Sequence, residues 1–357
     1  MASTRGARPS GRTTIISGLA TPWLLAAILA AGAVILLVSI RMTALADTIA
    51  DRAGWGEALV GGVVLGAATS LSGLVVSGGA ALSGDASLAF SNGVGGIAAQ
   101  TAFIAVADIW HRRANLEHAA AEPANLFQAA MLMILLSLPV LAWASPEMTV
   151  LGVHPVTLAM LAAYVLGLRY AARVRDRPLW RPVETEQTRA DEPEDEEEAN
   201  RSVRGPALQF AVLAAILGVS GWVLGQAGAT VTARFGLSSS LVGALVTAVI
   251  TSLPELVTTL AAVRRGALQL AVGGIIGGNT FDTLFLVVSD GLYRDGSLFH
   301  AVGRTDLFWL ATALAMTAVL MAGLVLRQPK GPGGIGVESV TLLGLYGAAV
   351  ALQAVSG

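Results

Sequence analysis

Long apolar stretches, separated by short polar connections, run through almost the whole chain. A helix that crosses a lipid bilayer needs about 20 predominantly apolar residues. Ten stretches of about this length occur, at 20–44, 57–83, 86–110, 124–144, 149–170, 207–233, 237–263, 267–291, 304–327 and 335–355. The pattern predicts an all-α integral membrane protein with ten transmembrane helices, five on each side of one hydrophilic loop.

The hydrophilic loop, residues 171–205, differs from the rest of the chain. It opens with four arginines between positions 173 and 181 and continues with nine acidic residues between positions 184 and 198. Because such a block has no apolar face, we interpret it as a disordered, solvated linker, with a cation-sensing segment as the alternative. The chain then divides into an N-terminal tail (1–19), a first five-helix unit (20–170), the loop, and a second five-helix unit (206–357).

The distribution of lysine and arginine predicts the orientation in a cell membrane. These residues are more frequent in the connections that follow the odd-numbered helices than on the other side. The positive-inside rule therefore predicts a cytoplasmic central loop and two external termini. The first apolar stretch follows Arg5, Arg8 and Arg12, but it is longer than the apolar part of a signal peptide, so we expect a spanning helix.

The composition agrees with a membrane protein and narrows its chemistry. Hydrophobic residues make up 54% of the chain and charged residues 13%, against about 25% charged residues in soluble domains. The chain has no cysteine, which excludes disulfides, thiolate metal sites and cysteine catalysis. No basic patch indicates nucleic acid, so the expected partners are the lipid bilayer and inorganic cations, without a cofactor. The oligomeric state is left open.

An internal repeat links the two halves. A shift of 182 positions places residues 55–108 on residues 237–290 without a gap, and 19 of the 54 pairs are identical. Five spans in each half mean that the second copy enters the membrane from the opposite side. Inverted repeats of this kind are typical of secondary transporters, whose sites lie at the repeat interface near the membrane midplane.

The second copy contains the segment Thr251-Ser252-Leu253-Pro254-Glu255. A carboxylate within an apolar span is costly, by roughly 3 kcal/mol on insertion scales, and such residues mark functional sites. Pro254 breaks the helix and frees the carbonyl of Ile250. With Thr251, Ser252 and Glu255, this supplies the oxygen ligands that Na⁺ or Ca²⁺ prefers. A structural acid paired with an arginine is the alternative interpretation of Glu255.

The next apolar stretch contains Asn279 and Asp282, which lie on one helix face because they are three positions apart. We expect this face to meet Glu255 across the helix pair, so Asp282 and Asn279 are candidate ligands. The glycines that precede them, Gly277 and Gly278, permit close helix approach and fit a packing role equally well.

The first copy is chemically poorer. It keeps Thr69 and Ser70, but Gly73 stands where the second copy has Glu255, and Gln100 stands where it has Asp282. We therefore predict that the first half contributes hydroxyl and amide groups from Thr69, Ser70 and Gln100 and no central carboxylate. Asp108 and Asp290 match one another near helix ends, and we interpret them as interfacial or mouth residues, with core ligands as the alternative.

These motifs resemble the second α-repeat of the cation/calcium exchanger superfamily, which includes the sodium/calcium exchangers. The resemblance rests on Thr251-Ser252-Leu253-Pro254-Glu255 and on Gly277-Gly278-Asn279-Thr280-Phe281-Asp282. It implies two inverted five-helix repeats and cation coordination by Glu255 and Asp282. It also implies further oxygens from Thr251, Ser252, Thr69, Ser70 and Gln100.

The chain departs from the superfamily pattern at several site positions. The superfamily's first-repeat glutamate is Gly73 here, and its serine is Gly96 in one copy and Gly278 in the other. Ca²⁺ sites are tuned largely by the number of ligand charges, so a missing carboxylate is expected to weaken Ca²⁺ binding more than Na⁺ or H⁺ binding. The leading hypothesis is a secondary-active antiporter that exchanges Na⁺, Ca²⁺ or H⁺, and not an enzyme.

Two other functions were weighed against transport. The first repeat lacks a central carboxylate, which favours a relative that senses cations or acts as a scaffold without transporting them. An intramembrane aspartyl enzyme would use Asp108 and Asp290 as an acid pair that shares a proton. No protease motif surrounds either residue.

Overall fold

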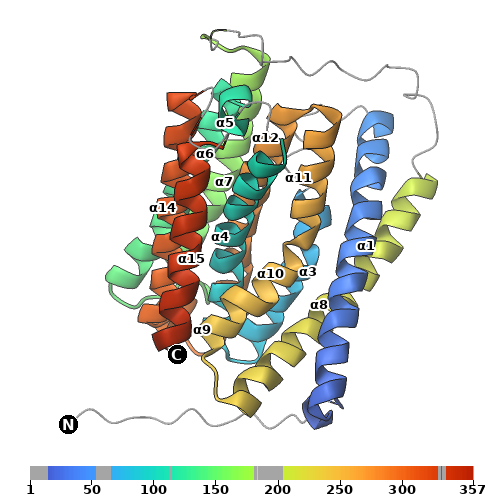
Figure 1. Ribbon diagram of the computed structural model, residues 1–357. Coiled ribbons are helices and arrows are strands. Elements are labelled where there is room, and N and C mark those ends of the chain that lie inside the picture. Colours follow the sequence, from blue (N-terminus) through green and yellow to red (C-terminus); the bar gives the residue numbers. More distant parts are fainter. Residues whose placement is uncertain are drawn as a thin grey trace.

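A computed structural model of the chain describes residues 15–53, 66–111, 115–180, 183, 204–328, 331 and 335–356. Its elements are helices, which stand side by side in a bundle (Figure 1). The acidic block at 184–198 and the start of the second predicted span lie outside the described residues.

The first half begins with a short 3₁₀ turn, η1 (Ile15–Gly18). Its helices are α1 (Thr21–Ala53), α3 (Gly66–Leu82), α4 (Ala86–His111), α5 (Leu116–Ala119), α6 (Pro123–Ala144) and α7 (Pro155–Asp176). The second half consists of α8 (Arg204–Phe235), α9 (Ser239–Leu241), the π-helical segment η4 (Val242–Thr247), α10 (Ala248–Thr251), α11 (Leu253–Arg265), α12 (Leu268–Leu292), α13 (Leu298–Ala301), α14 (Arg304–Leu326) and α15 (Val337–Ser356).

Eight of the described helices are long and apolar enough to cross a membrane, and the count is nine if the bent segment from α9 to α11 is one span. The described part of the second predicted span, α3, has only 17 residues. The chain is thus an all-α multi-pass membrane protein, whereas the count of ten spans stays a prediction.

Most predicted spans agree closely with the helices, but three boundaries differ. The fifth span was expected at 149–170, whereas α7 begins at Pro155 and continues to Asp176, into the segment expected to be the hydrophilic loop. Val150 and Val153 form a tight turn, and the ring of His154 caps the helix by accepting a hydrogen bond from the backbone of Val156. The first span extends beyond the expected end at 44, because α1 continues to Ala53.

The helix bounds repeat at the same shift of 182 positions that relates the sequences. The shift carries the start of α4 onto the start of α12, and the whole of α5 onto α13. It also carries the first residue of α7 onto the first residue of α15. In Figure 1, α1 begins at the lower end of the bundle and α8 begins at the upper end, so these neighbouring helices run in opposite directions.

The two halves interlock through buried aspartates at opposite helix ends. Asp108, at the end of α4, accepts hydrogen bonds from the backbone N–H of Leu116 and of Gly336, which precedes α15. Asp290, at the end of α12, accepts the corresponding bonds from Leu298 and from His154, which precedes α7. Each carboxylate therefore ties its own half to the last helix of the other half.

This arrangement corrects two interpretations of these aspartates. Asp108 is 1% exposed and Asp290 is fully buried, so they are buried links between the halves and not open mouth residues. Because their partners belong to separate sets of elements, they do not form the shared acid pair that an aspartyl enzyme needs.

The most enclosed helices are α4 and α12. In their most apolar windows, 78% and 67% of the residues are buried, against 33% for α1 and 22% for α8. A helix that is buried on all sides lies at the centre of the bundle, so residues on α4 and α12 are best placed to form an interior site. The long helices α1 and α8 pack on one another at the side of the bundle (Figure 1).

Glu117, in the short helix α5, predicts a pH dependence of stability. The pKa of its carboxyl is raised from 4.5 to about 8, mainly by burial and also by the nearby carboxyls of Asp108 and Glu338, while a hydrogen bond donated by Ser339 acts in the opposite direction. The folded state therefore holds this proton more tightly than the unfolded chain, so its contribution to stability is complete below pH 4.5 and is lost as the pH rises to about 8.

We expect Glu117→Gln to flatten the dependence of the melting temperature on pH in this window, because the amide does not titrate. The measurement is the melting temperature of detergent-purified protein across the pH range. Glu147→Gln, at an exposed loop position, is the control and should keep the wild-type slope. Equal slopes for Glu117→Gln and wild type would contradict the prediction.

Candidate cation site between the two halves

The helix that carries Glu255 is broken at the predicted position. α10 ends at Thr251 and α11 begins at Leu253, and the helix axes before and after the break differ in direction by 43°. Pro254 lies in the first turn of α11, where its missing N–H breaks no hydrogen bond. The π-helical segment η4 precedes the break, and such segments are frequent at functional sites.

Close packing of backbones holds this broken helix against α4. A Cβ atom added to Gly95 of α4 would lie 2.5 Å from the Cα atom of Ala244 in η4. At the residue next to Ala244, a Cβ atom on Gly243 would lie 3.0 Å from the carbonyl oxygen of Leu88 in α4. Glycine at both positions therefore allows a backbone contact that fixes the broken helix beside the site.

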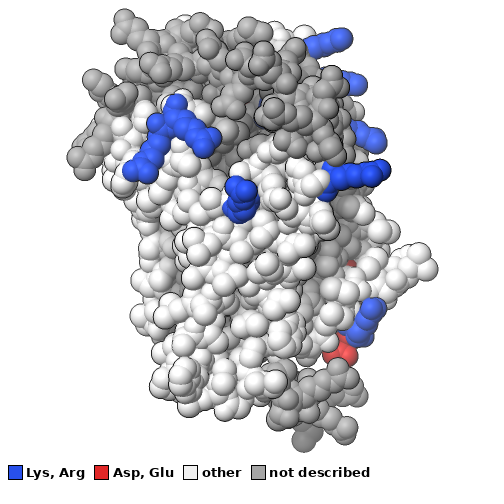
Figure 2. Space-filling view, turned by 90° about the vertical axis from the view of Figure 1, so that its right-hand side faces the viewer, with Lys and Arg blue, Asp and Glu red and all other residues white. Residues whose placement is uncertain are grey.

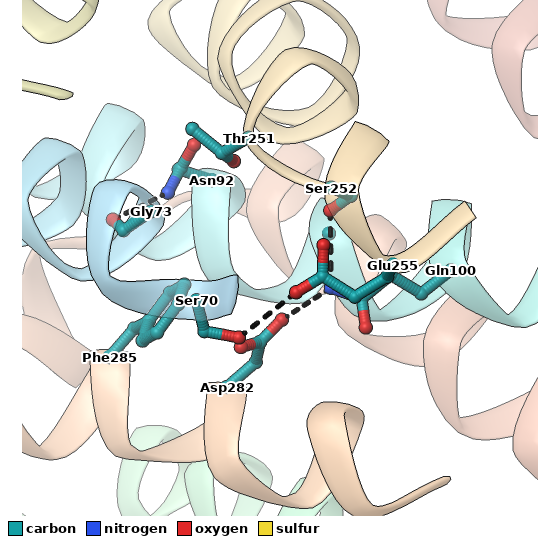
Figure 3. Close-up of a pocket in the computed structure, with 10 residues that line it drawn as sticks. Ser70, Gly73, Asn92, Gln100, Thr251, Ser252, Glu255, Asp282 and Phe285 are labelled. Carbon is teal, nitrogen blue, oxygen red and sulfur yellow. Dashed lines mark hydrogen bonds between the residues drawn. The ribbon is translucent and has the colours of Figure 1, made fainter. Parts of the chain in front are cut away.

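A buried pocket lies where α3, α4, the α10–α11 break and α12 meet (Figure 3). Both halves of the chain contribute to it. Its lining consists of Ser70, Gly73, Asn92, Gly96, Gln100, Thr251, Ser252, Glu255, Asp282 and Phe285.

The two acids of the pocket are each held by a polar residue of the first half. Ser70 donates a hydrogen bond of 3.2 Å to Oε1 of Glu255, and the hydroxyl of Thr69 also interacts with this carboxyl. The amide nitrogen of Gln100 donates to Oδ2 of Asp282 at 2.7 Å and to the hydroxyl of Ser252 at 3.1 Å. The first copy thus supplies donors to the carboxyls of the second copy, as Figure 3 shows.

Three buried oxygen atoms of the pocket residues have no hydrogen-bond partner among the described residues: Oε2 of Glu255, Oδ1 of Asp282 and Oε1 of Gln100. Buried polar atoms without a partner are rare, because each loses its contacts with water. Their presence in one pocket indicates a place for a proton or a cation that would contact them.

A family profile described as sodium/calcium exchanger protein matches residues 23–172 and 205–355, which is most of the chain. The chain belongs to the sodium/calcium exchanger family. Members of this family are membrane transporters of inorganic cations, so the resemblance found in the motifs is confirmed.

Two curated proteins match parts of the chain. This chain is 34% identical over 103 residues to CaxA, a candidate antiporter of Alkalimonas amylolytica. The matched segment covers 29% of this chain and 32% of CaxA. The chain is 34% identical over 111 residues to the inner membrane protein YrbG of Escherichia coli, which covers 30% of this chain and 33% of YrbG. The chain therefore matches about a third of the length of these curated relatives.

The fold matches that of solved structures that share little sequence with this chain. The sodium–calcium exchanger NCX_Mj superposes with a TM-score of 0.58 at 16% identity, over 92% of this chain and 98% of the other. The native structure of YfkE superposes with a TM-score of 0.55 at 14% identity, over 91% of each chain.

Six of the predicted site residues of this exchanger line the pocket, namely Ser70, Gln100, Thr251, Ser252, Glu255 and Asp282. Two predicted residues do not. Thr69 is buried next to Ser70 in α3, and its hydroxyl donates to the carbonyl of Gly66 and interacts with Glu255. Asn279 is fully buried, and its amide donates to the hydroxyl of Thr101 in α4.

Four lining residues were not predicted as site residues, namely Asn92, Phe285 and the glycines Gly73 and Gly96. Asn92 donates to the carbonyl of Gly73 and to Ser77, and it accepts a hydrogen bond from Thr247, so it connects α3 with η4. The available sequence signal was the repeat, because Asn92 is polar where the second copy has Gly274. Phe285 has no sequence signal that separates it from an ordinary core phenylalanine.

The charge of the pocket comes from two carboxyls only. In the described part of the chain, no group of three or more His, Asp or Glu side chains is placed to hold a metal ion. A Cβ atom added to Gly96 would lie 3.4 Å from the hydroxyl oxygen of Ser252 and 3.7 Å from Oδ2 of Asp282. This glycine therefore leaves the backbone of α4 open to the site.

The contact between Gly95 and Ala244 yields a stability prediction. We expect Gly95→Ala to lower the free energy of unfolding by about 1–3 kcal/mol, since the added methyl group would overlap a backbone atom that has no room to move. Thermal unfolding of the purified protein measures the change.

Gly79→Ala is the matched control, because Gly79 lies in helix α3 and an added Cβ atom there would meet nothing within 4 Å. It should leave the melting temperature unchanged or higher, since alanine has the better helix propensity. Similar melting temperatures for the two variants would contradict the proposed close contact.

Proposed function

We propose that this member of the sodium/calcium exchanger family is a secondary-active cation antiporter that exchanges Na⁺, Ca²⁺ or H⁺ through the pocket between its halves. One observation carries the proposal: Glu255 and Asp282 face a common buried space in which three oxygen atoms have no hydrogen-bond partner in the described part of the chain. Two carboxyls in a membrane interior are stable only if protons or cations compensate their charge.

Competition within the pocket provides a physical basis for exchange. The carboxyls of Glu255 and Asp282 bind either protons or a metal cation, and the two occupancies exclude one another because they use the same oxygen atoms. A carrier that reorients only when its charge is compensated then couples the inward movement of one ion to the outward movement of the other. Sites at the interface of inverted repeats suit this cycle, because each half closes one side.

The ligands of the pocket favour ions of low charge. Ca²⁺ takes six to eight oxygen ligands, and its affinity depends on the number of charged ligands. The proposed site has the carboxyls of Glu255 and Asp282, the hydroxyls of Ser70 and Ser252, and the amide of Gln100. Gly73 supplies no side chain, so Na⁺ and H⁺ are the preferred ions of the proposal and Ca²⁺ is the weaker one.

The distribution of surface charge supports an orientation in the membrane. Figure 2 shows a broad belt without charged side chains on the face formed by α1 and α8, with Lys and Arg gathered toward one end of it. This is the end at which α7 finishes and α8 begins (Figure 1). By the positive-inside rule, we infer that this end and the central loop are cytoplasmic and that both termini are external.

Flux through reconstituted protein tests the function. We expect proteoliposomes to exchange ²²Na⁺ against an imposed proton or Na⁺ gradient, with ⁴⁵Ca²⁺ flux measured in parallel. Glu255→Gln should lower the flux by about tenfold or more, since a contact with a charged group is worth about 1.5–3 kcal/mol.

Glu147→Gln, at an exposed position outside the pocket, is the control and should transport at the wild-type rate. Wild-type flux in Glu255→Gln would refute the site. Cation-dependent thermal stabilisation without any flux would instead favour the sensing or scaffolding relative.

Cysteine labelling tests the orientation, because the chain contains no cysteine of its own. Leu151 precedes α7 and Leu179 follows it, so they lie at opposite ends of this spanning helix, and both side chains are fully exposed. We expect a membrane-impermeant maleimide to label Leu151→Cys on intact cells and to label Leu179→Cys only after permeabilisation. The reverse pattern would invert the assigned orientation.

A further inference from the structure

The ring of Phe285 occupies the space beside Gly73, on the side of the pocket opposite to Glu255. A Cβ atom added to Gly73 would lie 2.7 Å and 3.0 Å from two atoms of this ring, and 3.4 Å from the hydroxyl oxygen of Thr251. Any side chain at position 73 would therefore collide with the ring. Figure 3 shows the ring at this edge of the pocket.

The internal repeat shows that the contact between Phe285 and Gly73 lies at a site position of the first copy. Gly73 is the counterpart of Glu255 at the shift of 182 positions. The first copy therefore lacks a carboxylate at this position, and a phenyl ring from the second copy stands where its side chain would begin. The position that lacks a carboxylate in the first copy is therefore also the position that the ring of Phe285 fills.

The ring of Phe285 is buried among neighbouring residues. Phe285 is 3% exposed. Its side chain also lies against Gly93, since a Cβ atom added to Gly93 would lie 3.4 Å from the Cβ atom of Phe285. Asn92 donates to the carbonyl of Gly73 at 3.1 Å, which fixes the backbone beneath the ring. The ring and the backbone beneath it are therefore both enclosed by neighbouring residues.

We propose that Phe285, seated on Gly73, is a specificity-determining residue that closes the first-half side of the cation pocket and disfavours Ca²⁺. This inference rests on the proposed function. An aromatic face supplies neither an oxygen ligand nor room for a bound water, and Ca²⁺ needs six to eight oxygen ligands where a proton needs one. The ring thereby selects ions that are satisfied by the oxygen atoms on the opposite wall.

Two variants test the role of Phe285 by removing its ring from the pocket, first without and then with an added carboxylate. Phe285→Ala removes the ring without adding charge, and the double variant Gly73→Glu with Phe285→Ala adds a carboxylate in the vacated space. We expect the ratio of ⁴⁵Ca²⁺ to ²²Na⁺ flux to rise in Phe285→Ala and to rise by about tenfold or more in the double variant, as an added charged ligand implies. Gly73→Glu alone should lower the melting temperature, because the ring still occupies the space.

Phe281→Ala is the matched control. Phe281 lies one turn earlier on α12 and packs beside Tyr164 and Gly66 without lining the pocket. This variant loses the same number of atoms and should keep the wild-type flux ratio. A rise of the same size in Phe281→Ala would mean that general loosening of the bundle, and not the ring of Phe285, changes selectivity, which would overturn the inference.

Failure of this inference is distinguishable from failure of the proposed function. Unchanged flux ratios in folded Phe285→Ala and in the double variant, with wild-type Na⁺ flux intact, would overturn the role of Phe285 alone. If wild type carries no cation, the proposed function fails. Thermal stabilisation by CaCl₂ then decides the inference: stabilisation of the double variant beyond wild type upholds it, and equal stabilisation overturns it.

Discussion

The burial of two carboxyl groups in one pocket is the constraint on which the structure depends. Glu255 is 4% exposed and Asp282 is 2% exposed, so both carboxyls lie in the interior of the bundle. Taking such groups out of water is expensive unless hydrogen bonds and an opposite charge compensate the loss. Ser70 and Gln100 supply part of this compensation, and the oxygen atoms that remain without a partner define the space for the proposed ion.

Hydrogen bonds and close backbone contacts around the pocket hold the two carboxyl groups in position. Asp108 and Asp290 bind main-chain N–H groups across the two halves, one at the end of α4 and the other at the end of α12. Between these ends, Gly95 brings α4 into backbone contact with η4. Because hydrogen-bonded links and close backbone packing permit little adjustment, the ligands from both halves keep their spacing. The peripheral helices α1 and α8 share much less of this enclosed packing.

The two copies share a backbone plan and divide the chemistry unequally. The second copy supplies both carboxyls, whereas the first supplies hydroxyl and amide groups that hold them. At Gly73 the first copy has also lost the room for a side chain, because Phe285 fills it. The asymmetry therefore concerns both charge and shape, and both changes disfavour an ion that needs many oxygen ligands.

Local patterns along the chain determined the helical membrane fold, the repeat, the helix break at Pro254 and the two central acids. These features depend on apolar length, on a missing N–H group and on identities between the copies, which are all properties of neighbouring or matched positions. Only the tertiary structure decided that Asp108 and Asp290 join the halves, that Asn279 faces Thr101 outside the pocket, and that Phe285 covers Gly73. Each of these contacts joins residues that are more than a hundred positions apart, and no local pattern encodes which side chains will meet when helices pack.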